Sequence, residues 1–154
     1  MIFQYRSVIV ATTCRILAPF LHLYSLYVIM HGHTSPGGGF QGGVIMGASF
    51  ILLVISLGRE EALRRMTQKA NDFFSSLGVF IYGGIGLACL LLGANYLDYG
   101  VLPFPGATPV KARYLGMLVI EIGIGISVMA IMVSIFLNLL GPETSSEEAD
   151  GIHR

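Results

Sequence analysis

The run from Tyr114 to Leu140, YLGMLVIEIGIGISVMAIMVSIFLNLL, decides the fold class, because Glu121 is its only charged residue. A helix needs about 20 apolar residues to cross about 30 Å of hydrocarbon, and this run exceeds that length. Hydrophobic residues make up 54% of the 154-residue chain and charged residues 12%, whereas soluble domains carry about 25% charged residues. The composition therefore indicates an all-α integral membrane protein rather than a soluble monomer.

Four apolar segments follow one another along the chain, and each predicts a transmembrane helix. The predicted spans cover residues 7–30, 38–57, 73–97 and 113–140, within one membrane domain of residues 1–141. The second span is long enough only if it includes the glycines that precede Phe40. Residues 142–154 are acidic and lack apolar periodicity, so we expect a disordered C-terminal tail.

Basic residues are distributed unevenly between the two sides of the predicted membrane domain. The N-terminal segment, the loop after the second span and the C-terminus hold six of them, whereas the outer loops hold only Lys111 and Arg113. Because basic residues concentrate on the cytoplasmic side, both termini are predicted inside, in a multi-pass protein of the cytoplasmic membrane. A formal net charge of zero leaves no basic surplus for nucleic acid. The six are Arg6, Arg59, Arg64, Arg65, Lys69 and Arg154.

A glycine-rich motif, HGHTSPGGGFQGG, runs from His31 to Gly43 at the start of the second span. Gly39, Gly43 and Gly47 recur every four residues and share one helix face, where small residues let a neighbouring helix approach closely. Alternatively, the exposed N–H groups of this helix start bind an anion or a polar group of a partner. The residues expected at this packing motif are His31, His33, Pro36, Gly37, Gly38, Gly39, Phe40, Gln41, Gly42, Gly43 and Gly47.

Three ionisable residues inside the predicted spans, Glu121, His22 and Arg15, are candidates for an ion path. A carboxylate at Glu121 could accept a proton or bind Na+, or it could be permanently paired and only fasten helices together. Arg15 and His22 lie seven residues apart on one helix face, and their depth predicts that Glu121 lies near one of them. The alternatives are that Arg15 snorkels to the interface and that His22 bonds a backbone carbonyl or another subunit.

The sequence predicts no catalytic site, cofactor or metal site. It offers neither a Ser/His/Asp order nor clustered carboxylates, and His31 and His33 have no further ligand near them. Cys14 and Cys89 lie in apolar segments and are expected to be buried hydrophobes. We therefore expect a protein that is not an enzyme by itself.

The motif from His31 to Gly43 resembles the MnhB/MrpB family, the B subunit of multisubunit Mrp-type Na+/H+ antiporters. Three shorter stretches, Leu17-Ala-Pro19, Leu26-Tyr-Val28 and Ile120-Glu-Ile-Gly123, extend the similarity. The resemblance implies a small, non-catalytic membrane subunit of a Na+ (or other cation)/proton antiporter. Its role would be that of a scaffold and a candidate part of the ion path. Its partners would be the lipid bilayer and other membrane subunits, both large antiporter-like ones and small ones.

Two alternatives to this function stay open. Relatives of the family also occur in membrane-bound hydrogenases and related ferredoxin-linked, redox-driven ion pumps. There the chain would belong to the antiporter module and would have hydrogenase or other redox subunits as partners. The other alternative is a membrane assembly protein with no transport role.

Overall fold

The computed structural model describes residues 8–32, 36–106 and 108–140, and within them the chain forms helices and no strand. Four helices are long and apolar enough to cross a membrane: α1 (Val8–Met30), α2 (Gly39–Leu57), α4 (Gln68–Leu91) and α5 (Pro109–Leu139). A short helix, α3 (Arg59–Arg65), links α2 to α4, and a 3-10 turn, η1 (Tyr99–Val101), lies between α4 and α5. The predicted all-α membrane protein with four transmembrane helices is confirmed. The expected tail, residues 142–154, lies outside the described residues.

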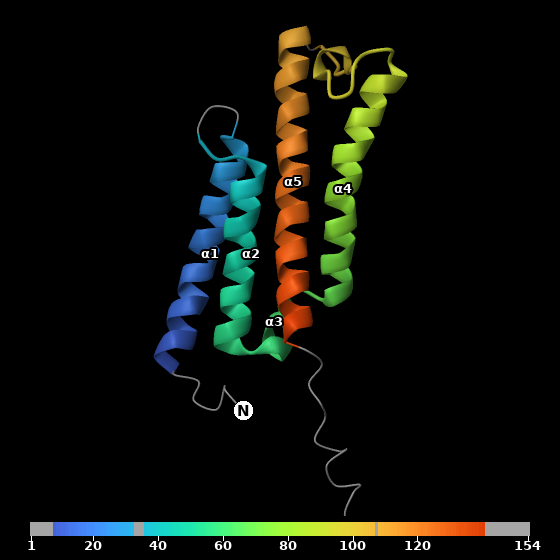
Figure 1. The fold of residues 1–154 in the computed structure, drawn as a ribbon. Helices are drawn as coiled ribbons and strands as arrows, with labels where there is room; N and C mark the ends of the chain where they lie inside the picture. Colours follow the sequence, from blue (N-terminus) through green and yellow to red (C-terminus); the bar gives the residue numbers. More distant parts are fainter. Residues whose placement is uncertain (1–7, 33–35, 107, 141–154) are drawn as a thin grey trace, which may run out of the picture.

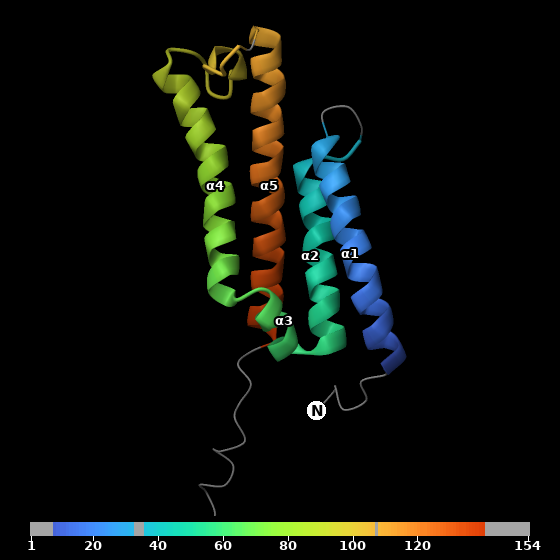
Figure 2. The ribbon, with the colours of Figure 1, turned by 180° about the vertical axis from the view of Figure 1, so that it is seen from behind.

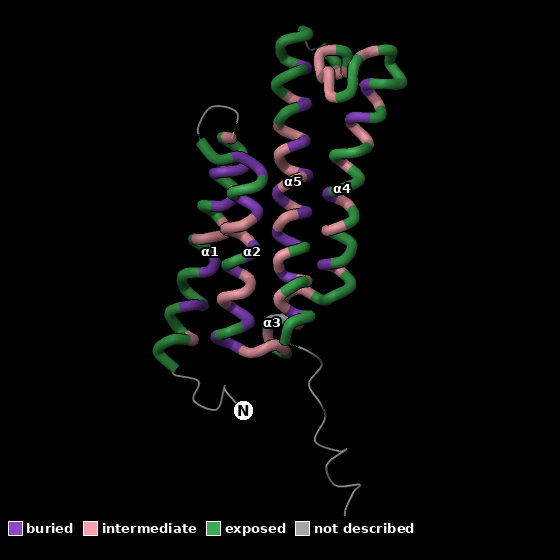
Figure 3. The backbone as a smooth tube through the Cα atoms, in the orientation of Figure 1, coloured by how far each residue is buried: buried purple, intermediate pink, exposed green. Residues whose placement is uncertain are grey.

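The four long helices stand side by side in the order α1, α2, α5, α4, as both ribbon views show (Figure 1 and Figure 2). Helices α2 and α5 occupy the middle of this row, and Figure 3 shows buried residues along both of them. In the most apolar window of each helix, 44% of α2 and 39% of α5 is buried, against 17% of α1 and of α4. The outer two helices therefore leave most of their surface to lipid or to other proteins.

The helix ends do not coincide with the limits of the apolar runs. The third span was predicted over residues 73–97, but α4 begins at Gln68 after the extended Thr67 and ends at Leu91, before Gly93 with φ 79°. The fourth was predicted from residue 113, but α5 begins at Pro109 because Thr108 caps it, accepting a hydrogen bond from the Lys111 N–H at 3.4 Å.

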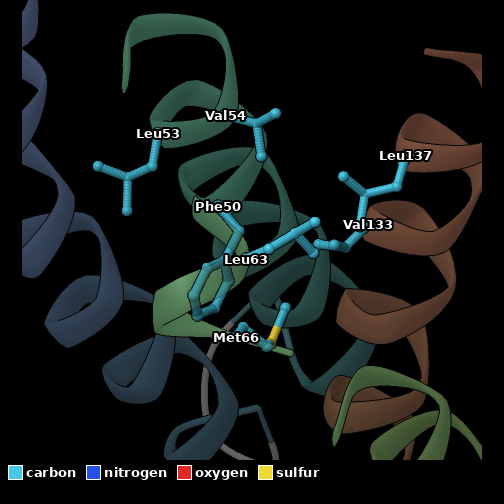
Figure 4. Close-up of a pocket in the computed structure, with 7 residues that line it drawn as sticks. All are labelled: Phe50, Leu53, Val54, Leu63, Met66, Val133 and Leu137. Carbon is cyan, nitrogen blue, oxygen red and sulfur yellow. The ribbon is translucent and has the colours of Figure 1, made fainter. Parts of the chain in front are cut away.

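The two ends of the row differ, and we name them the α3 end and the η1 end. The α3 end holds α3, the first residue of α1 and the last residue of α5, whereas the η1 end holds the α1–α2 connection and η1 (Figure 1). At the α3 end, Leu63 of α3 and Met66, which follows α3, pack on an apolar cluster between α2 and α5 (Figure 4). The residues that line the hollow there are Phe50, Leu53, Val54, Leu63, Met66, Val133 and Leu137.

Candidate functional site

Glu121 is the acidic residue that lies deepest in a membrane-spanning helix. It lies about 18 Å along α5 from Pro109, at 1.5 Å per residue, and its side chain is half-buried with Oε2 fully buried. A carboxylate at this depth is costly in lipid, so its surroundings in the protein decide what it can do.

Three glycines from the α1–α2 connection and the start of α2 surround Glu121, and we call them the glycine cradle (Gly32, Gly38 and Gly39). A Cβ atom added to Gly32 would lie 2.5 Å from Glu121 Oε2, and one added to Gly38 would lie 3.8 Å from Oε1. A Cβ on Gly39 would collide with the Glu121 carbonyl oxygen and lie 2.9 Å from its Cα. Only residues without a side chain let the carboxylate and its backbone come this close.

The backbone of the cradle also places the carboxylate beside a helix N-terminus. Gly38 has φ 107°, a conformation that suits glycine, and α2 begins directly after it without a side-chain cap. The first N–H groups of a helix lack intrahelical partners and carry a partial positive charge. This end of α2 therefore presents partial positive charge to the Glu121 carboxylate oxygens.

Further small residues hold α2 at the distance that the cradle requires. A Cβ on Gly43 would lie 2.6 Å from the Gly125 carbonyl oxygen of α5, and one on Gly47 would lie 3.3 Å from that of Met129. On the other side of α2, Ser25 of α1 donates a hydrogen bond from Oγ to the Gly42 carbonyl oxygen at 2.8 Å. The helix is thus fastened to both of its neighbours.

The remaining residues of the motif divide between exposed positions and positions outside the described residues. His31 is exposed, with Nδ1 3.0 Å from the Tyr27 carbonyl oxygen and its ring stacked on that of Tyr27 at 4.3 Å. His33 lies outside the described residues. The exposed positions of the motif that follow are Pro36, Gly37, Phe40 and Gln41.

The structure does not bring Glu121 to Arg15 or His22, so the predicted proximity is wrong. Glu121 lies beside Gly32. At the rise of a helix, Gly32 is about 15 Å from His22 and about 25 Å from Arg15 along the helix axis. The prediction failed because α5 extends past the α1–α2 connection at the η1 end (Figure 1), so Glu121, although about 18 Å along α5, is level only with the end of α1. His22 instead packs on Phe50 of α2, with ring centroids 4.7 Å apart.

Sequence reasoning missed a polar seam between α4 and α5. Asn71 is only 1% exposed, and its Nδ2 donates to the Ala130 carbonyl oxygen at 3.0 Å and to Ser134 Oγ at 2.7 Å. One turn further on, Ser127 Oγ donates to the Ser75 carbonyl oxygen at 3.2 Å. Asn71 precedes the predicted third span of residues 73–97, and only the earlier start of α4 turns it toward α5.

The described part of the chain contains no cluster of three or more His, Cys, Asp or Glu residues that could hold a metal ion. Cys14 and Cys89 are buried and free, as their apolar surroundings predicted. The polar atoms that gather at the site are therefore the Glu121 carboxylate oxygens and backbone groups. Oxygen atoms suit a proton or a hard cation.

The fold and the site define a small multi-pass membrane protein whose middle helices approach through glycine and enclose one carboxylate. Residues 9–134 match the family described as "Domain related to MnhB subunit of Na+/H+ antiporter". The chain belongs to this family, as the motif from His31 to Gly43 indicated.

Individual relatives agree with this assignment. The chain is 28% identical over 141 residues to the "Putative antiporter subunit mnhB2" of Staphylococcus aureus strain Newman, a match that covers 88% of this chain and 95% of the relative. The same protein of strain JH1 matches equally. Among solved structures, a chain of the archaeal membrane-bound sulfane sulfur reductase, a respiratory membrane complex, is similar with a TM-score of 0.76 and 27% identity. That match covers 91% of this chain but only 60% of the solved chain.

Proposed function

We propose that this protein is a small, non-catalytic subunit of a multisubunit Mrp-type antiporter in the cytoplasmic membrane, which exchanges Na+ or another cation for protons. The family match over residues 9–134 supports this proposal. So does the Staphylococcus aureus relative, which is named as an antiporter subunit and is covered over 95% of its length. The uncovered surfaces of α1 and α4 suit a chain that packs among other membrane subunits.

The observation that carries a role in transport is the position of the Glu121 carboxylate in the glycine cradle. The N-terminus of α2 favours a negative charge there, and the surrounding glycines let the backbone come close to the carboxylate oxygens. A carboxylate in this setting can hold a proton or a cation in turn. We therefore assign Glu121 to the ion path, with Gly32, Gly38 and Gly39 as the residues that position it.

The test is Glu121→Gln in the full complex, because glutamine keeps the shape of the side chain but cannot carry the charge. We expect Na+-dependent proton movement in membrane vesicles, followed with a pH-sensitive dye, to fall about 100-fold, at the lower end of what a positioned proton-transfer group contributes. The matched control is Glu60→Gln in α3, at an exposed position, which should exchange normally. Normal exchange by an assembled Glu121→Gln complex removes Glu121 from the ion path, and loss of assembly assigns it to fastening helices.

A second candidate function is a place in the antiporter module of a redox-driven complex. The observation that favours it is the structural similarity to a chain of the sulfane sulfur reductase, a respiratory membrane complex. Purification of the tagged chain in a mild detergent separates the two functions. Antiporter-like membrane subunits alone support the first function, and additional iron–sulfur or nickel subunits support the second.

We further propose that the α3 end faces the cytoplasm. Arg59, Arg64 and Lys69 lie there, whereas Lys111 and Arg113 lie at the η1 end. The excess of basic residues at the α3 end supports this orientation.

A further inference from the structure

Helix α1 presents a row of residues, polar except for Pro19, that the described part of the chain leaves largely uncovered, and we call it the polar edge of α1 (Thr12, Arg15, Pro19 and His22). These positions follow one another at spacings of three and four residues, which places them on one side of a helix. Thr12, Arg15 and Pro19 are exposed, and His22 is half-buried. A polar edge of this kind is unfavourable against acyl chains.

The charge of Arg15 has no counterpart in the described part of the chain. Arg15 lies about 10 Å into α1 from Val8, and it makes no hydrogen bond or ion pair there. An ionised side chain at this depth normally faces a protein partner or water and pairs with a group of opposite charge.

Pro19 adds a second unsatisfied group on the same side. Proline has no N–H, so the Arg15 carbonyl oxygen lacks the donor that residue 19 of a regular helix would supply. In lipid such a carbonyl needs another partner, and neighbouring helices normally provide it. The stretch from Arg15 to Pro19 therefore offers both a cation and an open acceptor to whatever lies beside α1.

The polar edge continues into an apolar surface that a helix could also cover. His22 packs on the Phe50 ring at 4.7 Å between centroids, and Phe50 lines the hollow with Leu63 of α3 and Met66, which follows α3 (Figure 4). A lipid phosphate could reach Arg15 from the membrane surface, but His22 lies about 10 Å further along the helix. A single head group therefore does not account for the whole edge.

We propose that the polar edge of α1 is the docking surface for a transmembrane helix of a neighbouring subunit, one that carries a carboxylate level with Arg15. A guanidinium and a carboxylate form strong, charge-assisted hydrogen bonds, often two at once. The apolar flank of the same helix would lie over Phe50. The inference rests on the proposed function only in taking the neighbour to be a membrane subunit of the complex.

The first experiment compares Arg15→Leu with Arg15→Lys in the tagged full chain, produced together with the rest of the complex. We expect Arg15→Leu to co-purify at least about tenfold less of the other membrane subunits, because the neighbour's carboxylate is left unpaired. Arg15→Lys keeps the charge and should retain most of them. The matched control, Leu17→Ala, changes a residue that is 45% exposed and points away from the edge. Normal recovery of subunits with Arg15→Leu overturns the proposal and assigns Arg15 to snorkelling.

A second experiment leaves Arg15 in place, in case Arg15→Leu fails to reach the membrane. A photo-crosslinking amino acid is introduced at position 12 or at position 26, where Leu26 is 49% exposed and continues the edge. Capture of another membrane subunit from either position supports docking. Capture of lipid alone from both positions overturns it. Neither readout involves ion exchange, so a failure here is distinguishable from a failure of the Glu121→Gln test.

Discussion

The glycines of α2 and those in the middle of α4 have opposite surroundings. Gly39 and Gly43 of α2 lie against the backbone of α5, so that an added Cβ would collide with Glu121 or lie 2.6 Å from the Gly125 carbonyl oxygen. Around Gly83 and Gly84 of α4, an added Cβ would meet no atom of residues 8–32, 36–106 or 108–140 within 4 Å. The same residue type thus permits a close contact in one helix and leaves an open surface in the other.

This difference shows that glycine in a membrane helix is not by itself a sign of internal packing. Glycine destabilises a helix by about 1 kcal/mol relative to alanine, and in α2 the approach of two backbones offsets that loss. Helix α4 contains both kinds, because Gly78 lies against the Gly123 carbonyl oxygen, at 2.5 Å from an added Cβ, whereas a Cβ added to Gly83 has no neighbour among the described residues. The open pair is a surface that other proteins can approach.

The largest expected effect that tests this comparison comes from Gly39→Ala. The added methyl group would collide with the Glu121 carbonyl oxygen, which belongs to the backbone and cannot rotate away. We expect α2 and α5 to separate and the free energy of unfolding to fall by about 3 kcal/mol, at the upper end for overpacking. Thermal unfolding of the purified chain in detergent measures this change. Unchanged stability would show that the two backbones do not touch.

An intermediate effect is expected from Asn71→Ala, which tests whether polar bonds add to the glycine contact between α4 and α5. The substitution removes the hydrogen bonds to the Ala130 carbonyl oxygen and to Ser134 Oγ. Because each such bond between membrane helices contributes about 0.6 kcal/mol on average, we expect a loss of about 1 kcal/mol. The same unfolding measurement applies, with Asn95→Ala, at an exposed position, as the control. Equal stability of the two variants would contradict the polar seam.

The smallest effect is expected from Gly83→Ala, which should raise the free energy of unfolding, whereas the two substitutions above should lower it. The methyl group enters open space, so the better helix propensity of alanine should raise the stability of the isolated chain by up to about 1 kcal/mol. Destabilisation of the isolated chain would show that another part of this protein covers Gly83.

Much of the fold could be predicted from the sequence, and much of the candidate site could not. The four spans follow from apolar runs, and Glu121 was recognised as a membrane-embedded carboxylate because its neighbours in sequence are apolar. Its surroundings were mistaken, since they depend on how far α5 extends past the α1–α2 connection. Asn71 was missed for a related reason: α4 begins at Gln68, before the apolar run does.

The sequence by itself determined the number of transmembrane helices and which charged residues they carry. These are local properties, set by how many consecutive residues are apolar and by the cost of moving a charge into lipid. Only the tertiary structure decided that Gly32, Gly38 and Gly39 enclose Glu121, and that Gly83 stays open. Those contacts join residues far apart in the chain, so they depend on the order of the helices and on the level at which each pair meets.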